Sequence, residues 1–258
     1  MNFFSRKDIK YFNNFVRKGY LIKNTENKKS SDYLIKTFEN LTCKILKKKN
    51  IDLNYLHKYI SVSDLNEFRI ELYNKVNADK NIRLNYFKIG QESLFNIVGN
   101  ELMMQNKLNV SIQFPNDDSS ILPIHSDVWQ GNSPYEANLW IPLVNCYKTK
   151  SMFILDGKYR YNYFKNKKNF LSSSGKIYKI LKKKLIWLKV NKGQFLLFDQ
   201  TLPHGNIVNV EKQTRISMNC RFKSIFSPYK NKKIAEYFSP ISIRAMTEIG
   251  NKYESPYL

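Results

Sequence analysis

The chain has little cysteine, no long apolar run and no linker-like segment, and each absence narrows what it can be. Its three cysteines, Cys43, Cys146 and Cys220, are an odd number at no metal-like spacing, so we expect buried free thiols in a reducing compartment. Because no stretch of about 18 apolar residues occurs and the N-terminal residues lack an apolar signal core, neither a membrane span nor a secretion signal is predicted, and a cytoplasmic location is expected. With no internal repeat or Gly/Ser-rich linker, residues 1–258 predict a single domain.

Acidic residues are also scarce. Lys and Arg number 43 against 21 Asp and Glu, which gives a formal net charge of +22. This charge favours nucleic acid, an anionic membrane or a phosphorylated small molecule through long-range attraction. The alternative is compositional bias, because Lys, Asn, Ile and Tyr are abundant along the whole chain and the lysines do not gather in one basic helix. A hydrophobic content of 42% and an aromatic content of 14% indicate a folded protein in either case.

Only three histidines are present, and two of them belong to the pattern His125, Ser126, Asp127 and, further along, His204. Two imidazoles and one carboxylate are the ligand set of a mononuclear non-haem Fe(II) site with open coordination positions. In an extended strand, residues 125 and 127 project to the same face, so both can bind one metal ion. An isolated His-x-Asp pattern is short, however, and most single histidines are ordinary core or surface residues, which is how we interpret His57.

The segments around these residues support a metal site. Upstream, a predicted strand at 111–114 and a polar turn at 116–120 put His125 at the start of the next extended segment. Downstream, a turn glycine and an apolar run at 193–199 predict a buried strand that leads into the loop carrying His204. That histidine lies between a proline and a glycine, where a stiff backbone suits a metal ligand.

Residues 215–222 alternate in polarity, so that Arg215, Ser217, Asn219 and Arg221 share one face of a predicted strand. The commonest meaning of this pattern is an exposed strand whose polar face meets water. The alternative is a polar face lining the mouth of a barrel, where the planar guanidinium of Arg215 pairs with a dicarboxylate and Ser217 adds a hydrogen bond. Because arginine matches two carboxylate oxygens better than lysine does, we favour the second interpretation if the metal site exists.

Three sequence segments carry a resemblance to a known family. These are HSDVWQGNSPYE at 125–136, NLWIPLV at 138–144 and KSMFIL at 150–155. Together they resemble the 2-oxoglutarate/Fe(II)-dependent dioxygenases of the phytanoyl-CoA dioxygenase-like kind, and more narrowly a bacterial subgroup associated with carbohydrate-biosynthesis genes. The similarity is strong over 111–222 and weak in the C-terminal tail. It implies a mainly β fold, a double-stranded β-helix or jelly-roll (cupin-like) barrel, with N-terminal and C-terminal helices packed outside.

The resemblance also implies a site and a chemistry. It makes His125, Asp127 and His204 the iron ligands, with 2-oxoglutarate and O2 as co-substrates. It assigns the 5-carboxylate of 2-oxoglutarate to Arg215 and Ser217, with Gln113 as a weaker neighbour. Oxidative decarboxylation to succinate and CO2 then accompanies hydroxylation, desaturation or epimerisation of a second substrate, whereas an aspartate in the triad argues against halogenation. Candidate residues of the substrate pocket are Trp129, Asn132, Tyr135, Glu136, Asn138, Trp140 and Arg221.

The leading hypothesis is an oxidoreductase that hydroxylates a sugar or sugar-derived small molecule in polysaccharide or natural-product biosynthesis; an anionic or phosphorylated substrate would suit the basic chain. One alternative is a nucleic-acid dealkylating dioxygenase, because Arg215 and Arg221 have the spacing found in alkylation-repair enzymes. We regard nucleic acid as the less favoured partner, since no basic stripe with interleaved aromatics accompanies the site. The other alternative is a non-catalytic barrel with a structural Zn(II), for which a filled fourth ligand position would be diagnostic.

Around the barrel core, predicted at 108–222, we expect helical scaffolding. Within residues 1–107, helices are predicted at 32–47 and 91–104, and at 64–76 after a capping box of Asp64 and Glu67. A basic insertion near 158–184 is expected between two strands, either as a solvated surface or as a face that grips a phosphate-bearing substrate. The tail, 223–258, predicts two short helical pieces, at 234–238 and 246–249, that close the barrel or build a homodimer contact.

Overall fold

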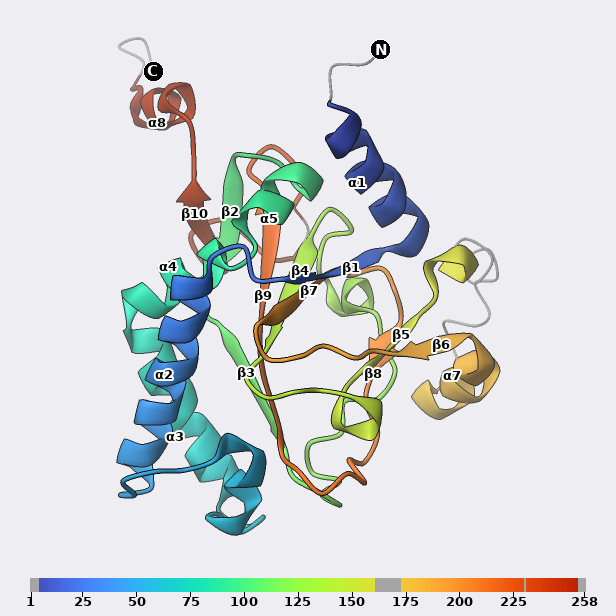
Figure 1. Ribbon diagram of the computed structural model, residues 1–258. Helices are drawn as coiled ribbons and strands as arrows, with labels where there is room; N and C mark the ends of the chain where they lie inside the picture. Colours follow the sequence, from blue (N-terminus) through green and yellow to red (C-terminus); the bar gives the residue numbers. More distant parts are fainter. Residues whose placement is uncertain (1–4, 161–172, 230, 255–258) are drawn as a thin grey trace.

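The computed structural model describes residues 5–160, 173–229 and 231–254, and its strands form two antiparallel sheets (Figure 1). The larger sheet has seven strands in the order β1-β7-β4-β9-β2-β10, with β3 also paired to β9. Its strands are β1 (Tyr20–Asn24), β2 (Leu102–Gln105), β3 (Asn109–Gln113), β4 (Ala137–Pro142), β7 (Gln194–Asp199), β9 (Arg215–Ser224) and β10 (Phe238–Ser242). The smaller sheet has the order β6-β5-β8, from β5 (Phe153–Leu155), β6 (Leu185–Trp187) and β8 (His204–Gly205).

The two sheets face each other across a shared interior. Phe198 on β7 of the larger sheet and His204 on β8 of the smaller sheet have ring centroids 4.9 Å apart. Ile154 on β5 belongs to the same apolar core as the inward residues of the larger sheet. Two antiparallel sheets that close over a common interior, with helices outside, form the double-stranded β-helix that the sequence predicted.

Helices cover the outer face of the larger sheet. Within the described residues, the α-helices are α1 (Arg6–Lys18), α2 (Lys28–Ile45), α3 (Leu65–Ala78), α4 (Lys80–Lys88), α5 (Gln91–Ile97), α7 (Ser174–Leu181) and α8 (Ala245–Lys252). Figure 1 shows α2, α3 and α4 together on one side of the sheet. The buried Tyr86 of α4 donates its hydroxyl proton to the backbone oxygen of Leu139 in β4 at 2.5 Å, which ties this helical layer to the centre of the sheet.

Two local predictions about helices were wrong. The helix at 65–78 forms, but Asp64 does not cap it: its backbone is already helical, and its carboxylate accepts from the Ser61 hydroxyl at 2.6 Å instead. The expected helix at 91–104 ends at Ile97, since Gly99 adopts a φ of 134° and the chain then enters β2.

The expected division of the chain also needs correction. The larger sheet takes β1 and β2 from the segment expected to be helical scaffold, and β10 from the tail, so the sheet extends beyond 108–222. The predicted helical piece at 234–238 is a turn leading into β10, because the fully buried Phe238 pairs with β2 in the larger sheet. The second predicted piece of the tail forms as α8.

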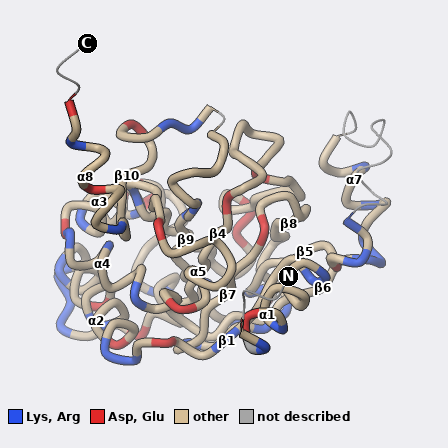
Figure 2. The backbone as a smooth tube through the Cα atoms, turned by 90° about the horizontal axis from the view of Figure 1, so that it is seen from above, with Lys and Arg blue, Asp and Glu red and all other residues tan. Residues whose placement is uncertain are grey.

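The basic insertion lies between β5 and β6, which pair with each other. Residues 161–172 of the predicted insertion lie outside the described residues, while α7 and a 3-10 turn at Lys182–Lys184 belong to its described part. Seen from above in Figure 2, basic residues lie around α2 and α4 and also beside β6 and α7. None of the described helices is long and apolar enough to cross a bilayer. Of the cysteines, Cys146 and Cys220 are buried free thiols and Cys43 is half-buried.

Candidate metal and co-substrate site

The structure brings His125, Asp127 and His204 together. One ligand atom from each lies within 4.8 Å of the others, and Asp127 and His204 are buried. The Nε2 atoms of His125 and His204 are 3.8 and 4.0 Å from the two carboxylate oxygens of Asp127. These are the only three ligand-type residues that group in this way among the described residues.

The local backbone at this pair differs from the expected strand. His125 forms an isolated antiparallel bridge with His204, with reciprocal N–H to oxygen distances of 2.9 and 2.8 Å. Asp127 then begins a 3-10 turn, Asp127–Gln130. Ser126 between them is extended and donates its hydroxyl to the backbone oxygen of Gln200 at 2.8 Å. The extended residue keeps the side chains of 125 and 127 on one side, so the juxtaposition predicted for a strand forms where the strand has already ended.

Both imidazoles are oriented by backbone carbonyls. Nδ1 of His125 lies 2.8 Å from the oxygen of Pro123, and Nδ1 of His204 lies 2.9 Å from the oxygen of Leu202. A carbonyl only accepts, so each Nδ1 carries a proton, and in the neutral ring the lone pair is then on Nε2, which faces Asp127. Burial lowers the pKa of His204 to about 4, which leaves it neutral at neutral pH. This is the tautomer and charge state that a metal ligand requires.

Asp127 is held by an arginine rather than left free. Nη2 of Arg221 donates to Oδ1 of Asp127 at 2.9 Å, while the buried Oδ2 has no hydrogen-bond partner. Arg221 is itself held by Gln200 (3.2 Å), by the Tyr237 hydroxyl (2.9 Å) and by Gln105 (3.3 Å). Burial opposes ionisation of Asp127, but the charges that His204, Arg221 and His125 can carry outweigh it and lower its pKa. The result is a fixed carboxylate whose two oxygens lie 3.8 and 4.0 Å from the two imidazole nitrogens, with Oδ2 free of hydrogen bonds.

Arg215 lies in the interior and is only 5% exposed. It lines a cavity of about 80 Å³ together with His204, Ser111 and Asn138. Its Nη2 donates to Ser111 at 2.8 Å and its Nη1 to the Ser151 backbone oxygen at 3.4 Å, while Nε has no partner. No carboxylate of the described residues lies within ion-pairing distance of this guanidinium.

Five of the other predicted residues are buried near this cavity or near the metal ligands. Asn138 and Trp140 line the same cavity as Arg215, and the buried hydroxyl of Ser217 has no hydrogen-bond partner. Gln113 is fully buried, does not line the cavity, and donates to the Ile207 backbone oxygen at 2.7 Å. Asn132 donates to the Asp127 backbone oxygen at 3.0 Å, which steadies the 3-10 turn.

Two further predicted residues line a second, larger space. Tyr135, which is 58% exposed, and Glu136 line a groove of about 700 Å³ with Val128, the residue that follows Asp127. Trp129 instead packs against a small apolar cluster under α7. Burial raises the pKa of Glu136, only partly offset by the hydrogen bonds that it accepts from Ser133 and Gln200.

Two residues of the site were missed from the sequence. Ser111 lies two residues before Gln113 on β3, so strand periodicity puts it on the same face and could have found it. Gln200 bridges Arg221 and Glu136 through its side-chain oxygen and nitrogen, at 3.2 and 3.0 Å. It follows β7 directly in the loop that delivers His204, but only the folded structure shows which side chains it joins.

No protein-family model matches the sequence, and no curated protein matches it. Solved structures do match the fold. The non-heme monooxygenase ThoJ in complex with nickel superposes with a TM-score of 0.60 and 12% identity, over 91% of this chain and 84% of that one. EctD from S. alaskensis, solved with 2-oxoglutarate and 5-hydroxyectoine, superposes with a TM-score of 0.56 and 13% identity, over 87% of this chain and 78% of that one. HygX from Streptomyces hygroscopicus, solved with nickel, 2-oxoglutarate and hygromycin B, superposes with a TM-score of 0.52 and 12% identity, over 90% of this chain and 92% of that one. At these identities the likeness establishes the shared fold.

Proposed function

We propose that this chain is a non-haem Fe(II)- and 2-oxoglutarate-dependent oxygenase. The observation that supports this most is the combination of an oriented His-Asp-His group with an uncompensated buried arginine in the cavity that His204 also lines. The donor set fits Fe(II), since two neutral imidazoles and one carboxylate leave coordination positions open. The unpartnered atoms of Arg215 and Ser217 fit a carboxylate, which supplies acceptors for both.

In this proposal each residue has a defined task. His125, Asp127 and His204 hold the metal, and Arg221 fixes the carboxylate so that Oδ2 stays available. Arg215 and Ser217 anchor the distal carboxylate of 2-oxoglutarate. When bound, iron and 2-oxoglutarate supply the oxidising chemistry that consumes O2 and releases succinate and CO2 while a C–H bond of a second substrate is hydroxylated.

For the second substrate we propose a polar, sugar-like small molecule. The groove that starts at Val128 is lined by the hydroxyl of Thr201, the phenol of Tyr135, the carboxylate of Glu136 and the Arg160–Asp199 ion pair of 2.9 Å. Hydrogen-bond donors and acceptors gathered in one groove suit a molecule rich in hydroxyl groups. HygX, a protein of the same fold, was solved with a small molecule, hygromycin B, bound.

The two alternatives have less support. Nucleic-acid dealkylation was suggested by the spacing of Arg215 and Arg221, but Arg221 is fully engaged by Asp127, Gln200 and Tyr237. A structural zinc site would take a fourth protein ligand, and within the described residues only three ligand-type side chains converge.

The test is an anaerobic titration of the metal-free protein with Fe(II) and 2-oxoglutarate, followed by the visible charge-transfer absorption of the iron chelate. We expect the band in the wild type, its loss in His125→Ala, and a band that needs far more 2-oxoglutarate in Arg215→Met. His57→Ala is the matched control, because that histidine bonds Thr214 at 2.8 Å and takes no part in the triad, so its band should be unchanged. Tight Zn(II) binding with no band in the wild type would contradict the proposal.

A further inference from the structure

A further concave site lies on the outside of the smaller sheet. It is a groove of about 790 Å³ between α7, the end of β6 and the segment around Tyr147. Three aromatic residues line it, Tyr147, Tyr178 and Trp187, together with three lysines, Lys148, Lys182 and Lys189. We call it the aromatic-lysine groove.

The register of the smaller sheet separates this groove from the metal site. Trp187 of β6 pairs with Phe153 of β5, and the next residue of β5, Ile154, pairs with His204 of β8. Directly paired residues share a face, and consecutive residues of a strand point to opposite faces. Trp187 and Phe153 therefore lie on one face with α7, and His204 lies on the other, so the groove is a site of its own.

The aromatic side chains are anchored before any ligand arrives. The fully buried ring of Phe153 contacts Trp187 edge-on, with centroids 5.4 Å apart and planes at 77°. The same ring lies 5.4 Å from that of Tyr178. Trp187 nevertheless remains 36% exposed. An indole that is held from behind and exposed in front can stack on a planar ligand at little cost in conformational entropy.

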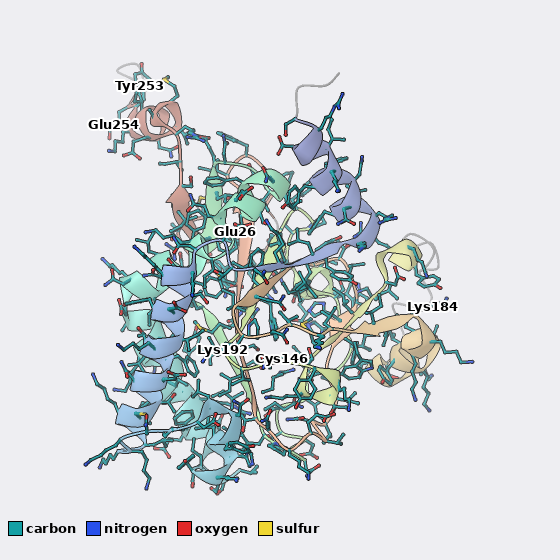
Figure 3. All side chains as sticks on the ribbon, in the orientation of Figure 1. Glu26, Cys146, Lys184, Lys192, Tyr253 and Glu254 are labelled. Carbon is teal, nitrogen blue, oxygen red and sulfur yellow. The ribbon has the colours of Figure 1, made fainter. Side chains whose placement is uncertain are left out.

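The lysines of the groove come from three different segments and converge on it. Lys148, Lys182 and Lys189 are all exposed, and none forms an ion pair with any residue that the structure describes. None of the residues that line the groove is acidic. Glu211 does not line it, but its carboxylate accepts a hydrogen bond of 3.4 Å from the hydroxyl of Thr149, which does. The basic run continues to Lys184, which Figure 3 shows beside α7 and β6.

We propose that the aromatic-lysine groove binds a nucleoside diphosphate, with the base stacked on Trp187 and the diphosphate among the three lysines. Stacking needs only a planar π face, and unpaired lysines attract phosphate as point charges. The volume lies within the range of small-molecule sites, whereas a nucleic-acid strand requires a groove that follows several nucleotides. The proposal does not depend on the oxygenase function, because the groove and the triad lie on opposite faces of the sheet.

The test is isothermal titration of the protein with ADP, in EDTA, so that phosphate cannot bind through iron. Trp187→Leu should weaken ADP binding at least about fivefold, while Trp187→Phe, which keeps a ring, should stay close to the wild type. The double variant Lys182→Ala, Lys189→Ala should bind ADP about tenfold more weakly, or weaker still. The matched control Lys28→Ala, Lys29→Ala removes the same charge from two exposed residues of α2 and should change little. His125→Ala should bind ADP like the wild type.

Several results would overturn the proposal. These are an absence of ADP binding, equal binding by Trp187→Leu in a protein whose thermal unfolding is unchanged, and equal loss in the α2 control. Inorganic pyrophosphate that binds as tightly as ADP would reduce the groove to a non-specific basic patch. A hexadeoxythymidylate that binds more than tenfold tighter than ADP would identify single-stranded nucleic acid as the ligand instead.

Discussion

Replacing Arg215 by methionine should greatly weaken 2-oxoglutarate binding without destabilising the metal-free protein. The guanidinium is buried, and no described carboxylate pairs with it. A Cys146 thiolate would favour the charged guanidinium, but burial raises the pKa of this thiol to about 12, so it is neutral at neutral pH and does not balance the charge. Cys146, labelled in Figure 3, is fully buried. The fold therefore carries a charge whose counter-ion must come from outside the protein.

The cost of this charge can be worked out from its pKa. Burial lowers the pKa of Arg215 to about 10, and at about 1.4 kcal/mol per tenfold change in acidity the drop corresponds to roughly 3 kcal/mol. Because the folded-state pKa lies below the unfolded-state pKa, the protonated form is penalised on folding at every pH below about 10, and the penalty is present in full at neutral pH. A methionine side chain removes this penalty on folding. It also loses the hydrogen bonds that Arg215 donates to Ser111 and Ser151, which are worth about 1 kcal/mol each. The free energy of unfolding should thus stay the same or rise by about 1 kcal/mol.

The assay is chemical denaturation with and without 2-oxoglutarate in the presence of Co(II), which avoids turnover. A co-substrate at one hundred times its Kd should stabilise the wild type by about 2.7 kcal/mol and Arg215→Met by nothing measurable. Arg69→Met is the control. That guanidinium is paired, since it lies 4.0 Å from Asp117 and donates to Ile112 and Ser120, so its loss should lower the free energy of unfolding by at least about 1 kcal/mol.

Two outcomes would refute this reasoning. If Arg215→Met lowered the free energy of unfolding by 2 kcal/mol or more, the arginine would be a structural residue whose charge the fold already compensates. If the variant retained the full stabilisation by 2-oxoglutarate, the co-substrate would bind somewhere other than the cavity that Arg215 and His204 line.

Two further predictions concern the support of the metal ligands. Arg221→Met should weaken Co(II) binding about 10- to 100-fold by releasing the carboxylate of Asp127, with Arg221→Lys intermediate, as measured by calorimetry; an unchanged affinity would contradict the positioning role. Gly205→Ala should lower both thermal stability and metal affinity, since a Cβ there would lie 2.7 Å from the backbone oxygen of Leu122, whereas the control Gly175→Ala meets nothing within 4 Å. Equal behaviour of the two alanine variants would show that the backbone beside the metal ligand can shift freely.

Features encoded locally were predictable from the sequence. The alternation in 215–222 predicted β9 and the face shared by Arg215 and Arg221, because side-chain direction has a period of two in any strand. The apolar run at 193–199 similarly predicted β7. The spacing of His125 and Asp127 predicted their juxtaposition, although the backbone there is an extended residue followed by a 3-10 turn.

Features set by pairing between distant segments were not predictable. Strands β1 and β10 complete the larger sheet through partners far along the chain, β7 and β2, and no local pattern in 20–24 or 238–242 announces those partners. The same holds for Gln200, since its contacts depend on how β9 and the loop after β7 pack. Propensity favoured a helix at 234–238, and burial of an aromatic residue in the sheet outweighed it.

The two arginines of β9 show why the structure separates roles that the sequence leaves equivalent. Arg215 and Arg221 share a face and a residue type, so periodicity alone assigns both to a pocket. Their counter-charges differ: Asp127 lies 2.9 Å from Arg221, whereas no described carboxylate pairs with Arg215. A cation that pairs with an anionic side chain inside the fold can position that side chain. A buried cation without such a partner keeps its full desolvation cost until a ligand supplies an anion. The charge balance of each arginine, rather than its place in the strand pattern, therefore indicates which one supports the metal ligand and which one awaits the co-substrate.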